Sequence, residues 1–280
     1  MIRRFLLACL VLPGLTACEA GSGAWSSAAP RPPAVPLRVV SLDYCADQYV
    51  LALVPRNRIA ALSPDARKSF SYHRARAAGI AQVPSRAEDV LVRRPDLVVR
   101  SYGGGPDAAR FFARSGVPVV QIGYANDLAG VRRTLIEVAD GLGASARGAA
   151  LARAMDARLA RLRGDRPARQ ALYMTPAGVT TGSGTLIHAM ITAAGLANFM
   201  DAPGWRPLPL ERLAYQRPDL VAAAFFGTET DHRDGWSAAR HPVARAQLRE
   251  RPVVNLDGAS TACGGWFVLD AVEALARGAE

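Results

Sequence analysis

One phrase of the sequence occurs twice, and the distance between its two copies constrains the fold. The stretch AEDVLVRRPDLVV, residues 87–99, is matched by LERLAYQRPDLVA, residues 210–222. Glu, Arg, Pro, Asp, Leu and Val recur at one offset of 123 residues, for example from Asp96 to Asp219. Solenoid repeats recur every 20–50 residues or so, which is much shorter than this period. The repeat therefore predicts two similar halves.

Short apolar runs alternate with helical patterns in both halves. The strand candidates of the first half are LRVVSL, RIAALS, DLVVRS and VPVVQIG, and Asp43 precedes the first helical pattern as its N-cap. RPARQALYMT, PDLVAAAFF and RPVVNLDG are the corresponding runs of the second half. Near-continuous apolar strands that alternate with helices are typical of parallel βαβ units. In the repeated phrase, the proline ends a helix and a strand follows it.

A helical segment of about forty residues separates the halves. Gly141 and Gly143 interrupt its periodic pattern, which predicts two helices, the second long and rich in arginine. We therefore predict an α/β fold of two lobes joined by a rigid helical connection. The expected boundaries are 37–125 for the N-terminal lobe, 126–165 for the helical linker and 166–280 for the C-terminal lobe.

The first 18 residues are organised as an export signal. MIRR is positively charged, FLLACLVL is apolar but too short to span a bilayer, and LTAC ends at Cys18. LTAC resembles the bacterial lipobox, which implies lipidation of Cys18, and ordinary cleavage beside an incidental cysteine is the alternative. We expect residues 1–18 to be a lipoprotein signal peptide and residues 19–36 a flexible tether. The protein is then exported, periplasmic and lipid-anchored to a bacterial membrane.

Composition narrows the class of protein. A hydrophobic fraction of 50% and a charged fraction of 21% describe a globular chain. The net charge is +10, but the arginines are scattered and Lys68 is the only lysine, which argues against a nucleic-acid-binding stripe. Once Cys9 leaves with the signal and Cys18 carries lipid, Cys45 and Cys263 remain. In an oxidising compartment these two can form a disulfide or stay apart.

Catalytic signatures are missing from the sequence. It contains no G-x-S-x-G, H-E-x-x-H, C-x-x-C or phosphate-loop motif. The segment DHRDGWSAARH could supply Asp231, His232, Asp234 and His241 as metal ligands, although a charged surface loop is the favoured interpretation. We predict no resident metal, no cofactor and no catalysis. An exported metal-dependent hydrolase on the same two-lobe scaffold is the alternative function.

Aromatic residues gather in the loops that follow the predicted strands. In an open α/β sheet, ligands bind beyond the carboxyl ends of the strands. Aromatic side chains there suit a large, flat or partly apolar ligand, although each one alone also fits ordinary packing. Tyr124 occupies one such loop. The residues that we predict to contact the ligand are Tyr44, Tyr72, Tyr102, Trp205 and Trp266, with Arg67 and Arg100 for an anionic ligand.

Four stretches together resemble the helical-backbone solute-binding proteins of ABC importers. They are RVVSLDYCADQYVLAL, AEDVLVRRPDLVV, TTGSGTLIHAMITAAGLANF and LPLERLAYQRPDLVA. This branch takes up ferric siderophores, haem and vitamin B12, and the resemblance covers residues 37–276. It implies two Rossmann-like lobes with parallel sheets, joined by a long rigid helix, with the ligand in a cleft between the lobes.

The resemblance also implies roles for individual residues. Glu88 and Glu211 match the paired acids, one per lobe, that dock against arginines of the permease transmembrane subunits, and each also favours its helix N-terminus. Trp205 matches an aromatic in the cleft of the B12 binder. Residues 257–266, DGASTACGGW, occupy the position of a cleft loop, but Cys263 departs from the better-known B12 and hydroxamate binders. Whether Cys263 pairs with Cys45 stays open.

The implied ligand is a metal chelate, namely a ferric siderophore, haem or a corrinoid. Siderophores are commonly anionic and suit arginines, whereas corrinoids are large and suit aromatic walls. The branch that binds bare zinc or manganese is disfavoured, because only His73 precedes the helical linker. We expect a monomer that delivers its chelate to an ABC permease, touches the membrane only through its lipid and binds no nucleic acid.

Overall fold

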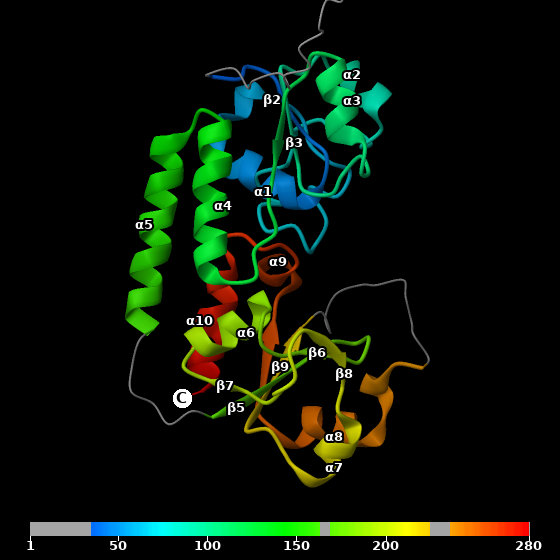
Figure 1. Cartoon of the computed structure of the whole chain (residues 1–280), viewed down its shortest axis with the longest axis vertical. Helices are drawn as coiled ribbons and strands as arrows, with labels where there is room; N and C mark the ends of the chain where they lie inside the picture. The colour runs from blue at the N-terminus through cyan, green and yellow to red at the C-terminus, as the bar shows by residue number, and fades with distance from the viewer. Residues whose placement is uncertain (1–34, 163–168, 225–235, 280) are drawn as a thin grey trace, which may run out of the picture.

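The computed structural model describes residues 35–162, 169–224 and 236–279 and consists of two lobes, one above the other in Figure 1. Each lobe is built around a four-stranded parallel sheet. A pair of helices runs along one side of both lobes (Figure 1). The predicted α/β fold with two parallel sheets is confirmed.

The sheet of the N-terminal lobe has the strand order β2-β1-β3-β4. Its strands are β1 (Val39–Ser41), β2 (Ile59–Ala61), β3 (Leu97–Arg100) and β4 (Val119–Gln121). The connecting helices are α1 (Tyr44–Leu53), η1 (Arg56–Arg58), α2 (Ala87–Leu91) and α3 (Ala108–Arg114). All three strand pairs are parallel, and every residue of β1 and β3 is buried because both faces of the sheet are covered.

The main sheet of the C-terminal lobe has the order β10-β9-β5-β7, which is the N-terminal order read from the opposite edge. Its strands are β5 (Gln170–Met174), β7 (Ala197–Asn198), β9 (Leu220–Ala224) and β10 (Val253–Leu256). An additional antiparallel ribbon pairs β6 (Val179–Thr181) with β8 (Trp205–Pro207). The helices are α6 (Leu186–Ala193), α7 (Leu210–Tyr215), η2 (Ala238–Arg240), α8 (Pro242–Glu250), α9 (Gly258–Thr261) and α10 (Val268–Gly278).

The repeated phrase plays the same part in both lobes. Helix α2 leads into β3 and α7 into β9, and these strands hold equivalent places beside β1 and β5. The Asp96 carboxylate accepts hydrogen bonds from the backbone amides of Leu37 (2.8 Å) and Arg38 (3.0 Å). The Asp219 carboxylate accepts one from the amide of Gln170 at 2.6 Å. Each aspartate ties the start of its own strand to the start of the neighbouring strand, so the repeat has a structural reason.

The connection between the lobes is a hairpin of two helices, α4 (Leu128–Gly141) and α5 (Ser145–Leu162). The break falls at the predicted glycines, so the single long helix implied by the resemblance is a helix pair. A Cβ atom on Gly148 of α5 would lie 2.2 Å from Ala139 Cβ of α4, so the close approach of the two helices requires glycine there. Arg158 of α5 then joins the hairpin to α10 through Asp270 (2.6 Å) and Glu273 (2.7 Å).

Aromatic residues hold the two lobes together beside the hairpin. The ring centroid of Tyr49 in α1 lies 5.2 Å from that of Trp266, and the Tyr72 ring stacks on Phe267 at 4.6 Å. The Tyr72 hydroxyl donates to Asp270 at 2.7 Å. Most of these residues belong to one buried cluster that also includes residues of α4 and α5. A continuous core of this kind opposes bending between the lobes. Across the described ranges, no helix has the length and apolar character needed to cross a membrane.

Candidate functional site: a cavity between the lobes

A cavity of about 510 Å³ lies between the two lobes. Its N-terminal wall comes from α1 and from the loops after β3 and β4, and its C-terminal wall comes from β5, α6, β8 and the loop after α9. These are the carboxyl ends of the central strands, where open α/β sheets bind ligands. Six aromatic residues line it: Tyr44, Tyr49, Tyr102, Tyr124, Tyr173 and Trp205. None of the described residues that line the cavity carries a charge.

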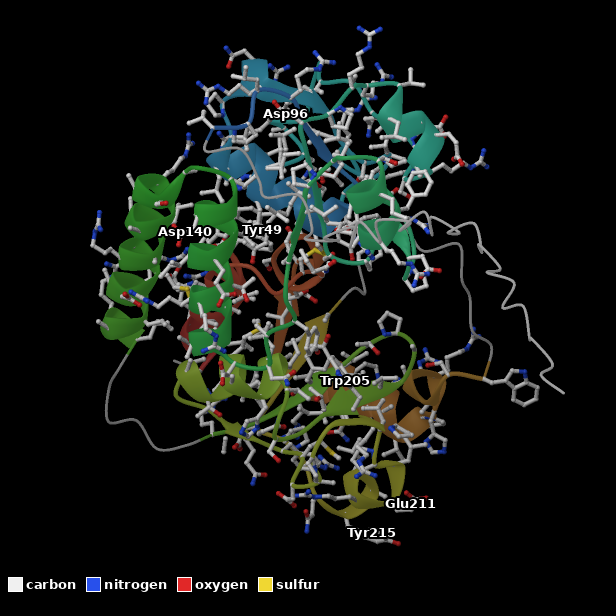
Figure 2. The ribbon with its side chains drawn as sticks, turned by 45° about the horizontal axis from the view of Figure 1, so that its top comes forward. Tyr49, Asp96, Asp140, Trp205, Glu211 and Tyr215 are labelled. Carbon is white, nitrogen blue, oxygen red and sulfur yellow. A yellow bond between two sulfur atoms is a disulfide. The ribbon has the colours of Figure 1, made fainter. Side chains whose placement is uncertain are left out.

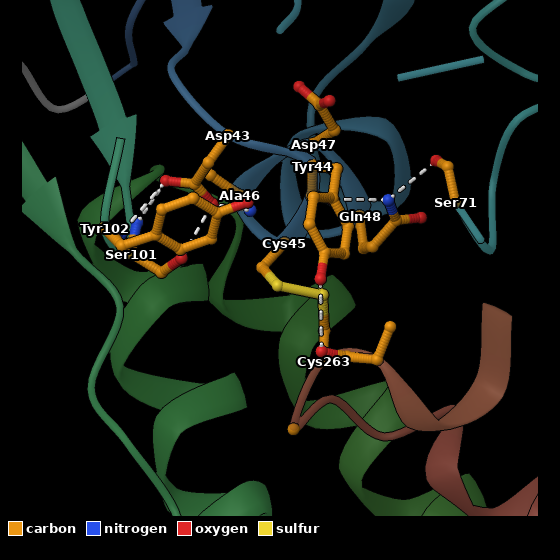
Figure 3. Close-up of a disulfide and its surroundings, with 12 residues drawn as sticks. Asp43, Tyr44, Cys45, Ala46, Asp47, Gln48, Ser71, Ser101, Tyr102 and Cys263 are labelled. Carbon is orange, nitrogen blue, oxygen red and sulfur yellow. Dashed lines mark hydrogen bonds between the residues drawn. A yellow bond between two sulfur atoms is a disulfide. The ribbon is translucent and has the colours of Figure 1, made fainter. Parts of the chain in front are cut away.

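Asp43 organises the N-terminal wall (Figure 3). One of its oxygens accepts from the amide of Ala46 (2.9 Å), which caps α1 and places Tyr44 at the start of the helix. Its carboxylate also accepts from the amide and hydroxyl of Ser101 and from the amide of Tyr102. With 3% of its surface exposed, Asp43 makes these bonds away from water. One buried side chain therefore fixes Tyr44 and Tyr102 of this wall.

The aromatic side chains form a pair on each wall. Tyr44 and Tyr102 meet edge to face with their ring centroids 6.1 Å apart, and on the opposite wall Tyr173 and Trp205 do so at 6.0 Å. Tyr102 is 55% exposed and Trp205 51% exposed, so much of each ring is available for contact. Figure 2 shows Trp205 in the C-terminal lobe, facing the gap between the lobes. A flat apolar ligand between these walls can stack against aromatic faces on both sides.

A disulfide between Cys45 and Cys263 joins the lobes at the cavity (Figure 3). Both cysteines line the cavity, so the bond is part of its surface. Beside it, the Tyr44 hydroxyl donates to the Ala262 carbonyl at 3.5 Å and the Tyr49 hydroxyl to the Gly264 carbonyl at 3.4 Å. The loop after α9 is thus held to α1 by covalent and polar contacts together.

The phenol groups of the cavity are kept neutral. Burial, and then the nearby carboxylate of Asp43, raise the pKa of Tyr44. Burial, and then the neighbouring Tyr44, raise the pKa of Tyr102. Burial alone raises the pKa of Tyr49 and of Tyr173. The tyrosines therefore present hydroxyl groups, not phenolates, to a ligand at neutral pH.

Four of the predicted contact residues do not line this cavity. Tyr72 and Trp266 are used in the junction between the lobes. Arg67 lies on the surface and donates to Gln82 Oε1 at 2.9 and 2.6 Å. Arg100 is 6% exposed and follows Val99 in β3. Because side chains alternate along a strand, Arg100 shares the sheet face of Val98, which packs beneath α2 and α3.

Sequence reasoning missed several residues of the cavity. Tyr173 lies one residue before the end of β5, where the rule of strand carboxyl ends would have found it. Tyr49 lies four residues after Cys45, one helical turn along α1. Tyr124 was noted in a loop without being assigned to the ligand. Ile187 of α6 carries no signal beyond its apolar character.

Glu88 and Glu211 lie at matching places in the two lobes. Each stands in the first turn of a short helix, α2 or α7, and each is exposed. In the part of the chain that the structure describes, neither forms an ion pair. One turn further on, Val92 is 80% exposed and Tyr215 90% exposed, and these two are also separated by 123 residues. Helices α2 and α7 lie at opposite ends of the molecule, away from the hairpin (Figure 1).

The candidate metal ligands of the C-terminal lobe are only partly visible. Asp231, His232 and Asp234 lie outside the described residues. His241 caps α8, where its ring nitrogen accepts from the amide of Val243 at 3.3 Å. Within the described ranges, no group of three or more His, Cys, Asp or Glu side chains could hold a metal ion. Cys18, the predicted lipidation site, also lies outside the described residues.

Two lobes on a shared helical connection, with an aromatic cavity between them, are the architecture of a protein that encloses a ligand between two domains. Residues 39–234 match the periplasmic binding protein family model. The chain belongs to the periplasmic binding protein family, which confirms the family predicted from the resemblance. Members of this family bind substrates and are not enzymes, and the family implies an exported, periplasmic location.

Solved structures share the fold. The periplasmic haem-binding protein RhuT from Roseiflexus sp. RS-1, in its apo form, is 23% identical with a TM-score of 0.66, over 87% of this chain and 99% of that one. The haem-binding protein HutB of Vibrio cholerae is 20% identical with a TM-score of 0.66, over 86% and 96%. The vitamin B12-binding protein BtuF of Vibrio cholerae is 18% identical with a TM-score of 0.63, over 89% and 98%. None of the curated proteins matches the chain.

Proposed function

We propose that this protein is the substrate-binding component of an ABC importer and that it carries a large, flat metal macrocycle. The observation that carries the proposal is the cavity of about 510 Å³ between the lobes, lined by six aromatic residues and by no charged residue among those described. Aromatic walls suit a macrocycle, because stacking contributes over the whole ring face. The fold relatives that bind haem or vitamin B12 support the same class of ligand.

Between the macrocycles, the neutral cavity favours a corrinoid. A corrinoid carries neutral amide side chains, whereas haem carries two carboxylates that would lie in the cavity without a cation. Anionic ferric siderophores are disfavoured because their charge would also lack a cation, since neither Arg67 nor Arg100 lines the cavity.

A gel-filtration binding assay shows which of these ligands the protein binds. Cyanocobalamin, haemin and a ferric hydroxamate siderophore are each mixed with the protein, and retention of colour with the protein on gel filtration is measured. The expected result is one-to-one retention of the corrinoid. Retention of haemin together with an iron–phenolate absorption band would contradict a corrinoid ligand but would still support a macrocyclic one. Retention of the siderophore alone would reject both.

Two matched surfaces are the proposed permease contacts. Glu88 with Val92, and Glu211 with Tyr215, place an acid and an exposed apolar side chain one turn apart in each lobe. Acids held at a fixed separation by a rigid body set the orientation of docking, and the apolar neighbour supplies area. Reversal of Glu88 and Glu211 to Arg is expected to abolish stimulation of transport in liposomes and to leave ligand affinity unchanged. Loss of affinity in that variant would assign both acids to the fold.

The proposed cellular setting follows from the export signal. Cys18 is proposed as the lipidated residue, residues 19–36 as the tether, and the protein as a monomer held to the membrane by lipid. Mass spectrometry of the protein purified from membranes tests this, since a diacylglyceryl adduct on Cys18 is expected. A mature N-terminus at another residue, without lipid, would contradict it.

A further inference from the structure

Six arginines stand at one edge of the N-terminal sheet, immediately before its four strands. They are Arg38, Arg56, Arg58, Arg93, Arg94 and Arg114. Because the strands are parallel, their amino ends meet at the same edge, which is the end of the molecule farthest from the C-terminal lobe (Figure 1). In Figure 2 nitrogen-tipped side chains crowd this end, where Asp96 is labelled. We call these six residues the arginine edge.

Two side chains of the arginine edge, those of Arg38 and Arg56, donate hydrogen bonds to backbone carbonyls and not to carboxylates. Arg38 donates to the carbonyls of Arg93 (2.5 Å) and Arg94 (3.0 Å). Arg56 donates to the carbonyl of Arg76 at 2.9 Å and also to that of Ala78. These contacts fix the guanidinium groups and leave their charge in place. Among the described residues, no member of the arginine edge forms an ion pair.

Asp96 is the one acid in the short segments that precede the four strands. Its two oxygens accept from the amides of Leu37 and Arg38 and from no guanidinium. The edge therefore keeps a strong net positive charge.

The matching edge of the C-terminal lobe is different. Arg217 is the counterpart of Arg94 at the same offset of 123 residues, and it lies 3.5 Å from the carboxylate of Glu250. Arg212 of α7 pairs with Asp201 at 2.7 Å. At the shared position, Arg217 is thus compensated in one lobe and Arg94 is not in the other, so the fold does not require Arg94 to be uncompensated.

The chain enters the fold at the arginine edge. The amide of Leu37, two residues before β1, is bonded to Asp96 in the middle of this edge. The eighteen residues 19–36 precede it, and a flexible segment of that length has a mean end-to-end distance of about 25 Å. A lipid on Cys18 would therefore keep the arginine edge within reach of the bilayer surface.

We propose that the arginine edge binds the anionic headgroup surface of the membrane and stands the tethered protein on its N-terminal end. The orienting role rests on the proposed lipid anchor, whereas the affinity of the edge for anionic headgroups does not. Arginines near an anionic bilayer each add modest attraction that salt weakens within a Debye length. The contact is consequently reversible, which leaves the protein free to turn towards a permease.

Vesicle sedimentation tests the proposal without the anchor. The chain from residue 19, which retains every described residue, is mixed with phosphatidylcholine vesicles that contain about one third phosphatidylglycerol, and with vesicles of phosphatidylcholine alone. Arg58, Arg94 and Arg114 are replaced together by Gln, because none of their side chains forms an ion pair with another described residue. The matched control replaces Arg217, Arg245 and Arg249 of the C-terminal lobe, which removes the same charge.

The edge variant is expected to bind anionic vesicles about tenfold more weakly than the wild type, and the control within about twofold of it. Equal losses in both variants would mean that net charge alone drives binding and would overturn the proposal. Equal binding to neutral and anionic vesicles, or binding that survives high salt, would also overturn it. Cyanocobalamin titration of the same samples reports the proposed ligand function separately.

Discussion

The two lobes share a scaffold but not a ligand wall. Both have four parallel strands in the same order, and in both an aspartate of the repeated phrase ties neighbouring strands together. The N-terminal wall of the cavity consists of a helix start and a loop that Asp43 holds with buried hydrogen bonds. On the C-terminal wall, an added antiparallel ribbon presents Trp205 half-exposed, beside β5, α6 and the loop after α9.

The strand order is therefore the same in both lobes, whereas the walls of the cavity differ between them. Strand order and strand ties depend on a few residues at fixed spacing, so they can be the same in both halves. The walls depend on contacts between side chains that are far apart in the sequence, so the wall of each lobe is built from different residues. The ligand accordingly meets a wall that one buried carboxylate holds on the N-terminal side and a wall that includes an added ribbon on the C-terminal side.

Cutting the covalent link between the lobes is the largest predicted perturbation. Replacement of Cys45 and Cys263 by Ala removes a bond that closes a loop of 218 residues. The free energy of unfolding is expected to fall by about 3–5 kcal/mol in urea denaturation. Dithiothreitol should cause the same fall in the wild type and none in the variant. An equal effect of the reductant on both proteins would contradict a stabilising disulfide.

Removal of Asp43 tests whether this carboxylate holds the N-terminal wall. Asp43→Ala leaves the amides of Ala46, Ser101 and Tyr102 without their acceptor, and a cost of about 2–4 kcal/mol is expected. Thr175→Ala is the C-terminal control, since the Thr175 hydroxyl bonds, among the described residues, only to the backbone of Val179 in the ribbon, and about 1 kcal/mol is expected. Equal costs in urea denaturation would show that the walls do not differ in this way.

The two aspartates of the repeat provide a finer comparison. Asp96→Ala removes the acceptor of two amides and Asp219→Ala that of one. Expected losses of stability are about 1–2 kcal/mol for Asp96 and about 1 kcal/mol for Asp219. Differential scanning calorimetry should show both variants unfolding at lower temperature, with Asp96→Ala lower. If Asp219→Ala unfolded at the same temperature as the wild type, the stabilising strand tie would be limited to the N-terminal lobe.

The smallest predicted effect concerns pH and two buried groups of the N-terminal lobe. Burial raises the pKa of Asp47 from 3.8 to about 6, although Ser63 opposes this by hydrogen bonding. The folded state then binds the proton more tightly than the unfolded state, so the Asp47 contribution to stability falls as pH rises from about 4 to about 6. Burial, with Arg76, lowers the pKa of His73 from 6.5 to about 4, so its contribution falls as pH drops through that range.

These opposite slopes are expected to leave the wild-type stability nearly level between about pH 4 and pH 6. Asp47→Asn should gain about 1–2 kcal/mol at neutral pH and lose stability on acidification, because the His73 slope then stands alone. Urea denaturation at several pH values measures this. A level profile in Asp47→Asn would contradict the shift at His73.

Much of the scaffold could be predicted from the sequence. Apolar runs located the central strands, the repeated phrase indicated two halves, and Asp43 was predicted to cap α1. These features depend on local pattern, which sequence periodicity reports directly. The break between the two helices of the hairpin falls at Gly141 and Gly143, as the sequence predicted.

The cavity was less predictable. Asp43 and Ser101 are 58 residues apart in the sequence, and no local pattern predicts their contact. Arg100 was predicted to contact an anionic ligand, but alternation along β3 turns it to the sheet face of Val98, and it does not line the cavity. Tyr72 and Trp266 stand in the expected loops, yet they are used at the junction between the lobes.

The most direct test of the account is a calorimetric titration of the protein with cyanocobalamin, run on the wild type and on Trp205→Ala. The wild type is expected to bind one corrinoid, and loss of the exposed ring should weaken binding about tenfold or more. Tyr215→Ala, which removes a more exposed aromatic far from the cavity, should bind as the wild type does. Absence of binding in the wild type, or equal affinity in Trp205→Ala, would contradict a corrinoid held between the two aromatic walls.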